Sequence, residues 1–204
     1  MPTTNRWHLP LLGSAAAGAG LAVLLLRRRK RQRPPAPAWF AALDAATAVR
    51  LPEWDNGTAW RAANEFMGTD YSHGPEAAVH VAGYHLDTCD TGARLTGAVH
   101  FGPGAESHRG LCHGGSMCTV MDDVLGWTGF CATGRCVPWS GFTVQVNTKL
   151  QAPVKVGSWL RVEGRVTSVD GRKVRVAAKL VSPAADGGEV VVHCEAEGLC
   201  IMKK

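Results

Sequence analysis

The chain has 204 residues, of which 46% are hydrophobic, so it is long enough for one domain with a substantial core and an added segment. The formal net charge of +5 is unevenly distributed, because residues 1–35 hold seven of the 22 Lys and Arg residues and none of the 17 acidic residues. The remainder therefore carries 15 basic and 17 acidic residues, which argues against a broad nucleic-acid-binding face. We expect no nucleic-acid partner.

The N-terminal segment, residues 1–35, contains an apolar run over residues 9–26, LPLLGSAAAGAGLAVLLL, followed at once by basic residues. Eighteen residues in a helix span about 27 Å, just enough to cross the hydrocarbon core of a membrane. Because a basic flank stays on the cytosolic side, the body of the chain is predicted to face the cytosol. The pattern resembles the signal anchors of the mitochondrial or plastid outer envelope. The alternative is a presequence that is removed, leaving the body inside the organelle.

Residues 36–75 are predicted to form a helical or irregular extension. The prolines around residues 34–37 favour a stiff linker, and the Ala- and Leu-rich stretch over residues 39–50 predicts a short helix that Pro52 ends. Residues 53–75 are rich in aromatic and turn-forming residues, and we expect them to cover the domain that follows.

The third region, residues 76–204, alternates apolar and polar residues in the manner of β-strands. Two such segments precede a helix pattern and four follow it, and the last four are joined by short links with turn signals such as Asp170-Gly171. The predicted strands cover residues 77–86, 94–101, 139–150, 159–169, 173–181 and 189–202. The Gly- and Pro-containing stretch 102–112 predicts a loop. This order indicates an α+β fold in which a long antiparallel sheet packs against one helix.

The chain has seven cysteines, an odd number, with no CxxC pair and no zinc-ligand spacing. The histidines show no ligand pattern such as HExxH, so no metal and no other cofactor is predicted. Cys194 and Cys200, an even number of residues apart on one predicted strand, should share a face. We therefore expect reduced cysteines that are mostly small core residues, as in a reducing compartment.

A helix is predicted to begin at His113-Gly114-Gly115. Its apolar stripe has helical spacing and should face the sheet; it consists of Met117, Val120, Met121, Val124 and Leu125. The two glycines leave the unpaired N–H groups of the first turn accessible at the positive end of the helix dipole. Donors in that position can polarise a carbonyl oxygen and stabilise an oxyanion.

Two acidic residues, Asp122 and Asp123, lie beside the apolar stripe of this helix. Asp122 follows His113 by nine residues and would supply a base or a nucleophile for the polarised carbonyl. A structural explanation stays open, in which the glycines permit close contact between helix and sheet and both carboxylates are solvated flanks of the stripe.

The helix segment LCHGGSMCTVMDDVLG resembles the hotdog-fold acyl-CoA thioesterases. It is preceded by VHFGP at residues 99–103 and followed by an alternating strand that runs from Thr143 towards Pro153. Thioesterase superfamily members 4 and 5 are the most similar, and the phenylacetic-acid-degradation thioesterases are more distant. The resemblance covers residues 77–202. It implies a hotdog fold with the sheet wrapped around the central helix, and a homodimer or dimer of dimers that hydrolyses acyl-CoA in lipid metabolism.

In these relatives the His-Gly backbone forms an oxyanion hole, an Asp activates water, and a Thr or Ser on the next strand assists. On this chain the corresponding residues are His113, Gly114, Asp122 and Thr143. Further contacts with the substrate are expected at Gly115, Asn147 and Lys149. Relatives often carry basic residues just before the Pro, where CoA phosphates can be held, whereas this chain has Gln151-Ala152. Lys149 and Lys155 could compensate, and strand alternation places Thr143, Gln145, Asn147 and Lys149 on one face.

The spacing of Gly114 and Asp122 has a consequence for assembly. Eight residues apart on one helix, they are separated by about 12 Å along its axis, farther than an Asp side chain reaches. If both act on one carbonyl, they come from different subunits. A two-fold dimer with two equivalent sites is then required.

Two other functions fit the same region. One is a non-catalytic acyl-CoA-binding or signalling adaptor on the same fold. The other is a dehydratase, because HFGPG at residues 100–104 resembles the HFPG stretch of hotdog acyl-carrier-protein dehydratases. That family uses the His with a helical Glu, whereas the helix here offers an Asp.

Overall fold

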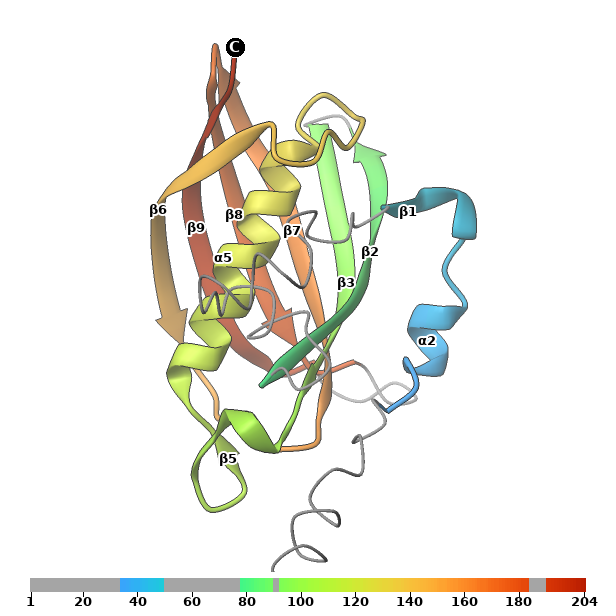
Figure 1. Cartoon of the computed structure of the whole chain (residues 1–204), viewed down its shortest axis with the longest axis vertical. Helices are drawn as coiled ribbons and strands as arrows, with labels where there is room; N and C mark the ends of the chain where they lie inside the picture. The colour runs from blue at the N-terminus through green and yellow to red at the C-terminus, as the bar shows by residue number, and fades with distance from the viewer. Residues whose placement is uncertain (1–33, 50–77, 90–91, 184–189) are drawn as a thin grey trace, which may run out of the picture. The chain divides into compact units, whose positions relative to one another are not determined.

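The computed structural model describes residues 34–49, 78–89, 92–183 and 190–204 (Figure 1). The predicted anchor at residues 9–26 and the predicted cover at residues 53–75 lie outside these ranges. Within the described ranges, no helix combines the length and the apolar character needed to cross a membrane.

Within the described residues, seven strands form one antiparallel sheet in the order β1-β2-β3-β7-β8-β9-β6. Their bounds are β1 Ala48–Val49, β2 Val79–Cys89, β3 Gly92–Phe101, β6 Gly141–Leu150, β7 Trp159–Asp170, β8 Lys173–Val181 and β9 Val192–Met202. Strand β6 precedes β7 in the sequence but pairs only with β9 in this sheet, so it forms one edge (Figure 1).

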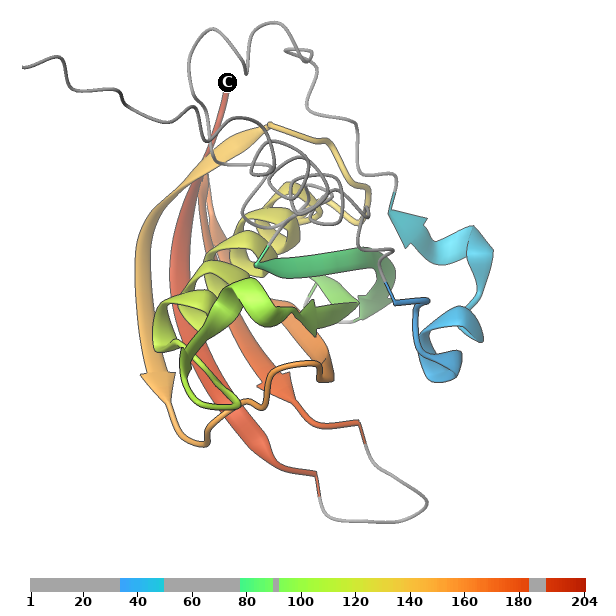
Figure 2. The same cartoon turned by 60° about the horizontal axis from the view of Figure 1, so that its bottom comes forward.

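The long helix α5 (Gly114–Phe130) lies against the inner face of the sheet, which curves around it (Figure 2). It contacts β3, β6, β7, β8 and β9. The predicted apolar stripe is confirmed, because its five members are all buried against the sheet. Apolar side chains on the inner face of β7, β8 and β9 complete the core, and Cys194 and Cys200 share that face as predicted. The α+β arrangement predicted from the sequence is therefore confirmed.

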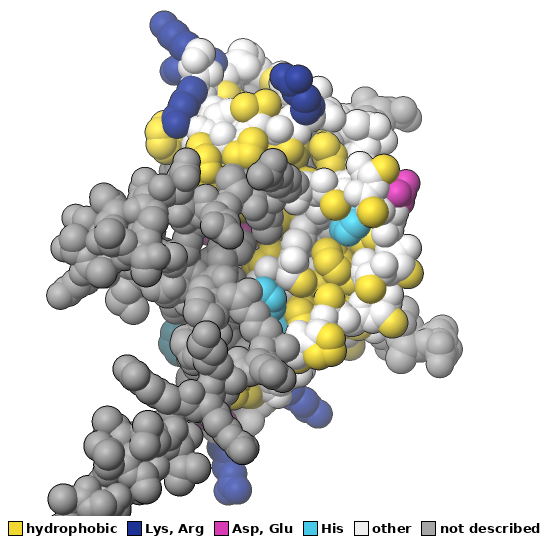
Figure 3. Space-filling model, turned by 45° about the vertical axis from the view of Figure 1, so that its right-hand side comes forward, with side chains coloured by type: hydrophobic (Ala, Val, Ile, Leu, Met, Phe, Trp, Pro, Cys, Tyr) yellow, Lys and Arg dark blue, Asp and Glu magenta, His cyan; other side chains and the backbone are white. Residues whose placement is uncertain are grey.

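The side of the molecule that carries α2 (Ala38–Ala41) and β1 is drawn in Figure 3, where hydrophobic side chains gather on the described surface. The predicted helix over residues 39–50 is wrong beyond Ala41. A 3-10 turn, η1 (Ala45–Thr47), follows, capped by the side chain of Asp44, and the chain then pairs with β2. The Thr47 hydroxyl also contacts Nδ1 of His85 at 2.9 Å. Hydrogen-bonding partners at the β2 edge thus override the weak helix preference of an Ala-rich segment.

The predicted loop over residues 102–112 is also more ordered than expected. It contains a 3-10 turn, η2 (Pro103–Ala105), and a small hairpin of β4 (Glu106–His108) and β5 (Leu111–Cys112). Gly110 closes the hairpin with φ 79°, a conformation that favours glycine, and its N–H donates to Glu106 Oε1 at 2.6 Å. Because His113 N–H donates to the Ala105 carbonyl at 2.7 Å, this hairpin fixes the position where α5 begins.

The strand predicted from residue 139 begins only at Gly141. Trp139 has φ 61°, in the left-handed region, which a strand residue does not adopt. Its ring packs against Trp127 and Phe130 of α5, with ring centroids 5.6 and 5.9 Å apart.

An alanine at Gly164 is expected to destabilise this fold. Gly164 on β7 faces α5, and a Cβ there would overlap the hydroxyl of Thr128, which is buried and donates to the Val124 carbonyl at 2.7 Å. Overpacking of this kind costs about 1–3 kcal/mol, which urea denaturation of the Gly164→Ala variant measures. Adding Thr128→Ala removes the overlapped hydroxyl, so the double variant should recover part of the loss. If the double variant instead lost as much stability as the two single variants added together, this explanation would be contradicted.

Candidate functional site

The start of α5 presents one free backbone donor. His113 is the N-cap, and its Nδ1 accepts the N–H of Gly115 at 2.8 Å, while its carbonyl accepts the N–H of Ser116 at 3.0 Å. Within the described residues, the N–H of Gly114 has no acceptor. The predicted donor Gly114 is therefore available to a ligand. The N–H of Gly115, a predicted substrate contact, is instead used in the cap.

Both glycines are also required for packing. A Cβ at Gly114 would lie 2.7 Å from Cδ1 of Leu150 on β6, and a Cβ at Gly115 would lie 2.8 Å from Nδ1 of His113. The first glycine thus permits close contact between helix and sheet, and the second permits the histidine cap. The packing explanation of the glycine pair is therefore supported, and the chemical one stays a prediction.

Two turns along the helix, Asp122 meets Thr143 of β6. The Thr143 hydroxyl lies close enough to the carboxylate to favour its ionised form. The approach is close because Gly126, one turn further on, has no side chain; a Cβ there would lie 3.3 Å from Thr143 Oγ1. The structure therefore brings together two of the predicted catalytic residues from neighbouring elements.

The pKa of Asp122 is raised above the ordinary value of an aspartate. Partial loss of hydration is the main cause, although the residue keeps some exposed surface, and the charge of Asp123 adds to it. The Thr143 hydroxyl acts in the opposite direction, because it stabilises the charged form. A carboxylate with a raised pKa is a stronger base, as activation of water requires.

Asp123 points to the other side of the helix and has a different partner. The hydroxyl of Tyr84 on β2 donates to Asp123 Oδ2 at 2.7 Å. Tyr84 is almost fully buried, and burial together with the carboxylate raises its pKa well above 10, so the phenol stays a neutral donor. Asp123 thus ties the helix to β2. This division of the two carboxylates supports Asp122 as the residue that faces a substrate.

The predicted common face of Thr143, Gln145, Asn147 and Lys149 is wrong. The register of β6 against β9 shifts between Thr143 and Gln145, so Val144 is an extra residue in the strand. Thr143 pairs with the buried Cys200 and faces α5, whereas Asn147 and Lys149 pair with Glu197 and Glu195 on the outer face. Within one chain, the predicted contacts Asn147 and Lys149 therefore lie on the opposite face of the sheet from Asp122.

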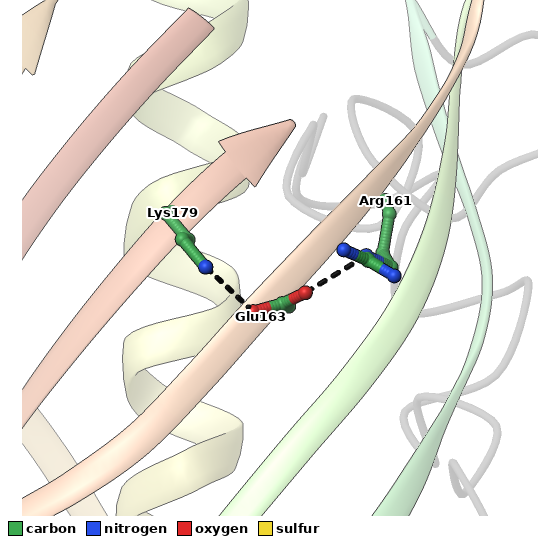
Figure 4. A network of polar contacts seen from close by, with 3 residues as sticks. All are labelled: Arg161, Glu163 and Lys179. Carbon is green, nitrogen blue, oxygen red and sulfur yellow. Dashed lines mark ion pairs between the residues drawn. The ribbon is translucent and has the colours of Figure 1, made fainter. Parts of the chain in front are cut away.

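The outer face of the sheet contains a groove of about 640 Å³ that Asn147 and Lys149 help to line. Among its lining residues, Glu163 of β7 forms an ion pair with Lys179 of β8 at 3.2 Å and a second one with Arg161 at 2.8 Å (Figure 4). No local sequence pattern marks this groove, because its walls come from five strands. Charged side chains of both signs line it, as on a solvated sheet face.

The dehydratase alternative requires a histidine that faces the helix, and His100 does not. His100 on β3 pairs with Trp159 of β7, and the centroids of their rings lie 5.2 Å apart on the outer face of the sheet. Its neighbours Val99 and Phe101 are fully buried on the helix side. His100 therefore cannot act together with an acid on α5 of the same chain.

The described residues include no group of three or more His, Cys, Asp or Glu side chains placed to hold a metal ion.

The edge strand β6 presents apolar side chains to solvent. Their exposed fractions are 61% for Phe142, 57% for Val144, 36% for Val146 and 49% for Leu150.

Part of the chain is similar to a known protein family. The family model described as "Thioesterase superfamily" matches residues 109–191, which include α5 and strands β6, β7 and β8. No curated protein matches the chain.

Solved structures similar to this chain include three thioesterases. Thioesterase superfamily member 2 from zebra fish is 15% identical, covering 62% of this chain and 83% of that one, with a TM-score of 0.47. Another thioesterase superfamily protein is 25% identical, covering 90% and 74%, with a TM-score of 0.48. A hypothetical thioesterase from Streptococcus pneumoniae, crystallised with coenzyme A, is 15% identical, covering 59% and 85%, with a TM-score of 0.47. The sheet curved around α5 is a hotdog-like arrangement, and residues 109–191 within it are similar to the thioesterase superfamily.

Proposed function

We propose that the chain hydrolyses acyl-CoA thioesters to the free acid and CoA, in a homodimer with two equivalent sites. The observation that carries the proposal is that α5 holds a free N–H at Gly114 and, eight residues further on, Asp122 beside Thr143 of β6. That helix lies inside the region matched by the thioesterase model, so thioester hydrolysis in general has independent support. The closer similarity to members 4 and 5 stays a prediction.

The chemistry follows from these groups. The Gly114 N–H hydrogen-bonds the thioester carbonyl and stabilises the negative charge that develops on its oxygen. The Asp122 carboxylate removes a proton from water as it attacks the carbonyl carbon, or it attacks the carbon itself to form an anhydride that water then cleaves. The Thr143 hydroxyl orients the carboxylate or the water. Collapse of the intermediate breaks the carbon–sulfur bond and releases CoA as a thiol.

A dimer through β6 accounts for the separation of Gly114 and Asp122 along α5. Strand β6 is an open edge that carries exposed apolar side chains, and such an edge is suited to pairing with another strand. If two copies pair along β6 about a two-fold axis, each helix start can approach the partner's Asp122. Two such dimers could in turn pack into a dimer of dimers.

A charge placed on this edge is expected to dissociate the dimer. Val144→Asp buries a carboxylate between the two copies, so sedimentation of the full chain in mild detergent should show monomers. Val169→Asp is the matched control, because Val169 is similarly exposed, at 55% against 57% for Val144, but lies on β7. Retention of the dimer by Val144→Asp would place the interface elsewhere.

The proposed activity is tested with the purified full chain and a panel of aliphatic and aryl acyl-CoA thioesters of several chain lengths. Release of free thiol shows hydrolysis. Binding of acyl-CoA without thiol release would instead support the adaptor function.

We also propose that residues 9–26 anchor the chain in a membrane, with the body facing the cytosol at the mitochondrial or plastid outer envelope. The full chain should stay in the membrane pellet after alkaline carbonate extraction, and deletion of residues 1–35 should release it. Protease added to intact organelles should digest the body. Protection of the body would contradict this orientation and support import after removal of a presequence.

A further inference from the structure

The turn that follows α5 brings two cysteines together. Cys131 is the C-cap of the helix, and its carbonyl accepts the N–H of Gly134 at 2.9 Å. Gly134 has φ 80°, which reverses the chain, and the N–H of Val137 then donates to the Phe130 carbonyl at 3.0 Å. The first of these backbone hydrogen bonds lies within the turn, and the second closes it just outside Cys131 and Cys136. The turn therefore brings the backbone positions of the two cysteines together.

The two thiols are unequal. Cys131 is fully buried, whereas Cys136 is partly open to solvent. The interaction between the two thiols lowers the pKa of Cys136 and, with burial, raises the pKa of Cys131. In contrast, burial raises the pKa of the core cysteines Cys112, Cys194 and Cys200. A partly exposed thiol with a lowered pKa beside a second thiol has the environment of a reactive cysteine.

We propose that Cys131 and Cys136 form a peroxide-sensitive thiol pair, in which Cys136 is the attacking residue and Cys131 the resolving residue. In the first step the Cys136 thiolate attacks hydrogen peroxide or an organic hydroperoxide. It breaks the O–O bond, becomes a sulfenic acid and releases water or an alcohol after protonation. In the second step the Cys131 sulfur displaces hydroxide from that sulfenic acid, and its own proton leaves with the hydroxide as water. Two thiols are oxidised to one disulfide, and the peroxide is reduced.

The geometry makes the second step short-range. Because the hydrogen bond from Val137 N–H to the Phe130 carbonyl closes the turn just outside both cysteines, their side chains can rotate to the disulfide length of about 2.05 Å without opening the turn. The disulfide would link the end of α5 directly to the segment that enters β6. That segment also holds Trp139 against Trp127 and Phe130, so oxidation fixes the connection between the helix of Asp122 and the strand of Thr143. The proposal concerns thiol chemistry and does not depend on thioester hydrolysis.

Peptide mapping of the full chain tests the pair directly, because Arg135 lies between the two cysteines. Trypsin separates residues 110–135 from residues 136–149, and the second peptide contains a single cysteine, Cys136. After brief treatment with hydrogen peroxide and blocking of free thiols, we expect these two peptides to be linked. The linked mass should be about 2 Da below the sum of the two reduced peptides, since two hydrogens are lost.

Variants identify the partner, because the first peptide also contains Cys112 and Cys118. Cys131→Ser should abolish the link and leave Cys136 as a sulfenic acid that dimedone labels. Cys118→Ser is the matched control, since Cys118 is also partly exposed, and it should leave the link unchanged. Persistence of the link in Cys131→Ser would overturn the proposal. So would a Cys136 thiol that stays reduced while Cys118 is oxidised.

Discussion

Asp122→Asn is expected to lower kcat for acyl-CoA hydrolysis by at least about a hundredfold, the usual scale for removal of a general base. An amide has nearly the same shape as the carboxylate and keeps an oxygen that can accept from the Thr143 hydroxyl, so the fold and acyl-CoA binding should be preserved. Steady-state kinetics measure the loss, and circular dichroism with equilibrium binding verifies the two controls. Asp123→Asn should have a much smaller effect on kcat, because Asp123 bonds Tyr84 on the other side of the helix.

The pH dependence of the hydrolytic activity gives a second way to distinguish the roles of Asp122 and Asp123. The base must be ionised, so activity falls as the pH decreases through the pKa of Asp122, which lies above the ordinary aspartate value. Asp123→Asn removes a neighbouring negative charge and should move this acid limb to lower pH. Thr143→Val removes a hydroxyl that favours the ionised form and should move it to higher pH. If Asp123→Asn were the more damaging variant, Asp123 rather than Asp122 would be the base.

Mixing two inactive variants is expected to restore about a quarter of the wild-type activity. One variant is Asp122→Asn, and the other is Gly114→Pro, which removes the donor N–H at a helix position where proline is tolerated. The new ring meets Leu150 Cδ1, the end of a half-exposed flexible side chain that can turn away. Random exchange makes about half of the dimers mixed, and each mixed dimer has one intact site of two.

The restoration depends on the shared site alone. In a mixed dimer one site receives both defects, and the other combines an intact Gly114 with an intact Asp122 of the other chain. Native mass spectrometry verifies that mixed dimers form, and the acyl-CoA assay measures their activity. Verified mixed dimers without any activity would place both residues in the site of one chain and contradict the geometric argument.

Periodicity predicted the parts of the fold that depend on many residues at once. The stripe from Met117 to Leu125 and the alternating strands each repeat over several turns or pairs, so single exceptions do not hide them. The helix predicted over residues 39–50 was wrong beyond Ala41, because a short Ala-rich stretch has only a weak preference for the helix. The edge of β2, which is distant in the sequence, decided its conformation.

The sequence indicated which residues could form the site, but not which way their side chains point. The β-bulge at Val144 inverts the faces of the strand beyond Thr143, and no feature of the composition marks it. The choice between Asp122 and Asp123 depends on Tyr84, which lies 39 residues from Asp123 in the sequence. The contact of Cys131 and Cys136 depends in the same way on the reversal at Gly134, which spacing alone does not specify.

The place of β6 in the sheet sets the order in which the site can assemble during synthesis. Within the sheet β6 is held by β9, which ends at Met202, and β9 in turn by β8. Thr143 therefore has no strand partner when it leaves the ribosome and must wait for about another fifty residues, which takes several seconds. Asp122 and its hydroxyl partner can meet only after the last strand has joined the sheet. A ribosome-bound nascent chain that lacks β9 accordingly has the helix and its glycines but not the pairing of Asp122 with Thr143.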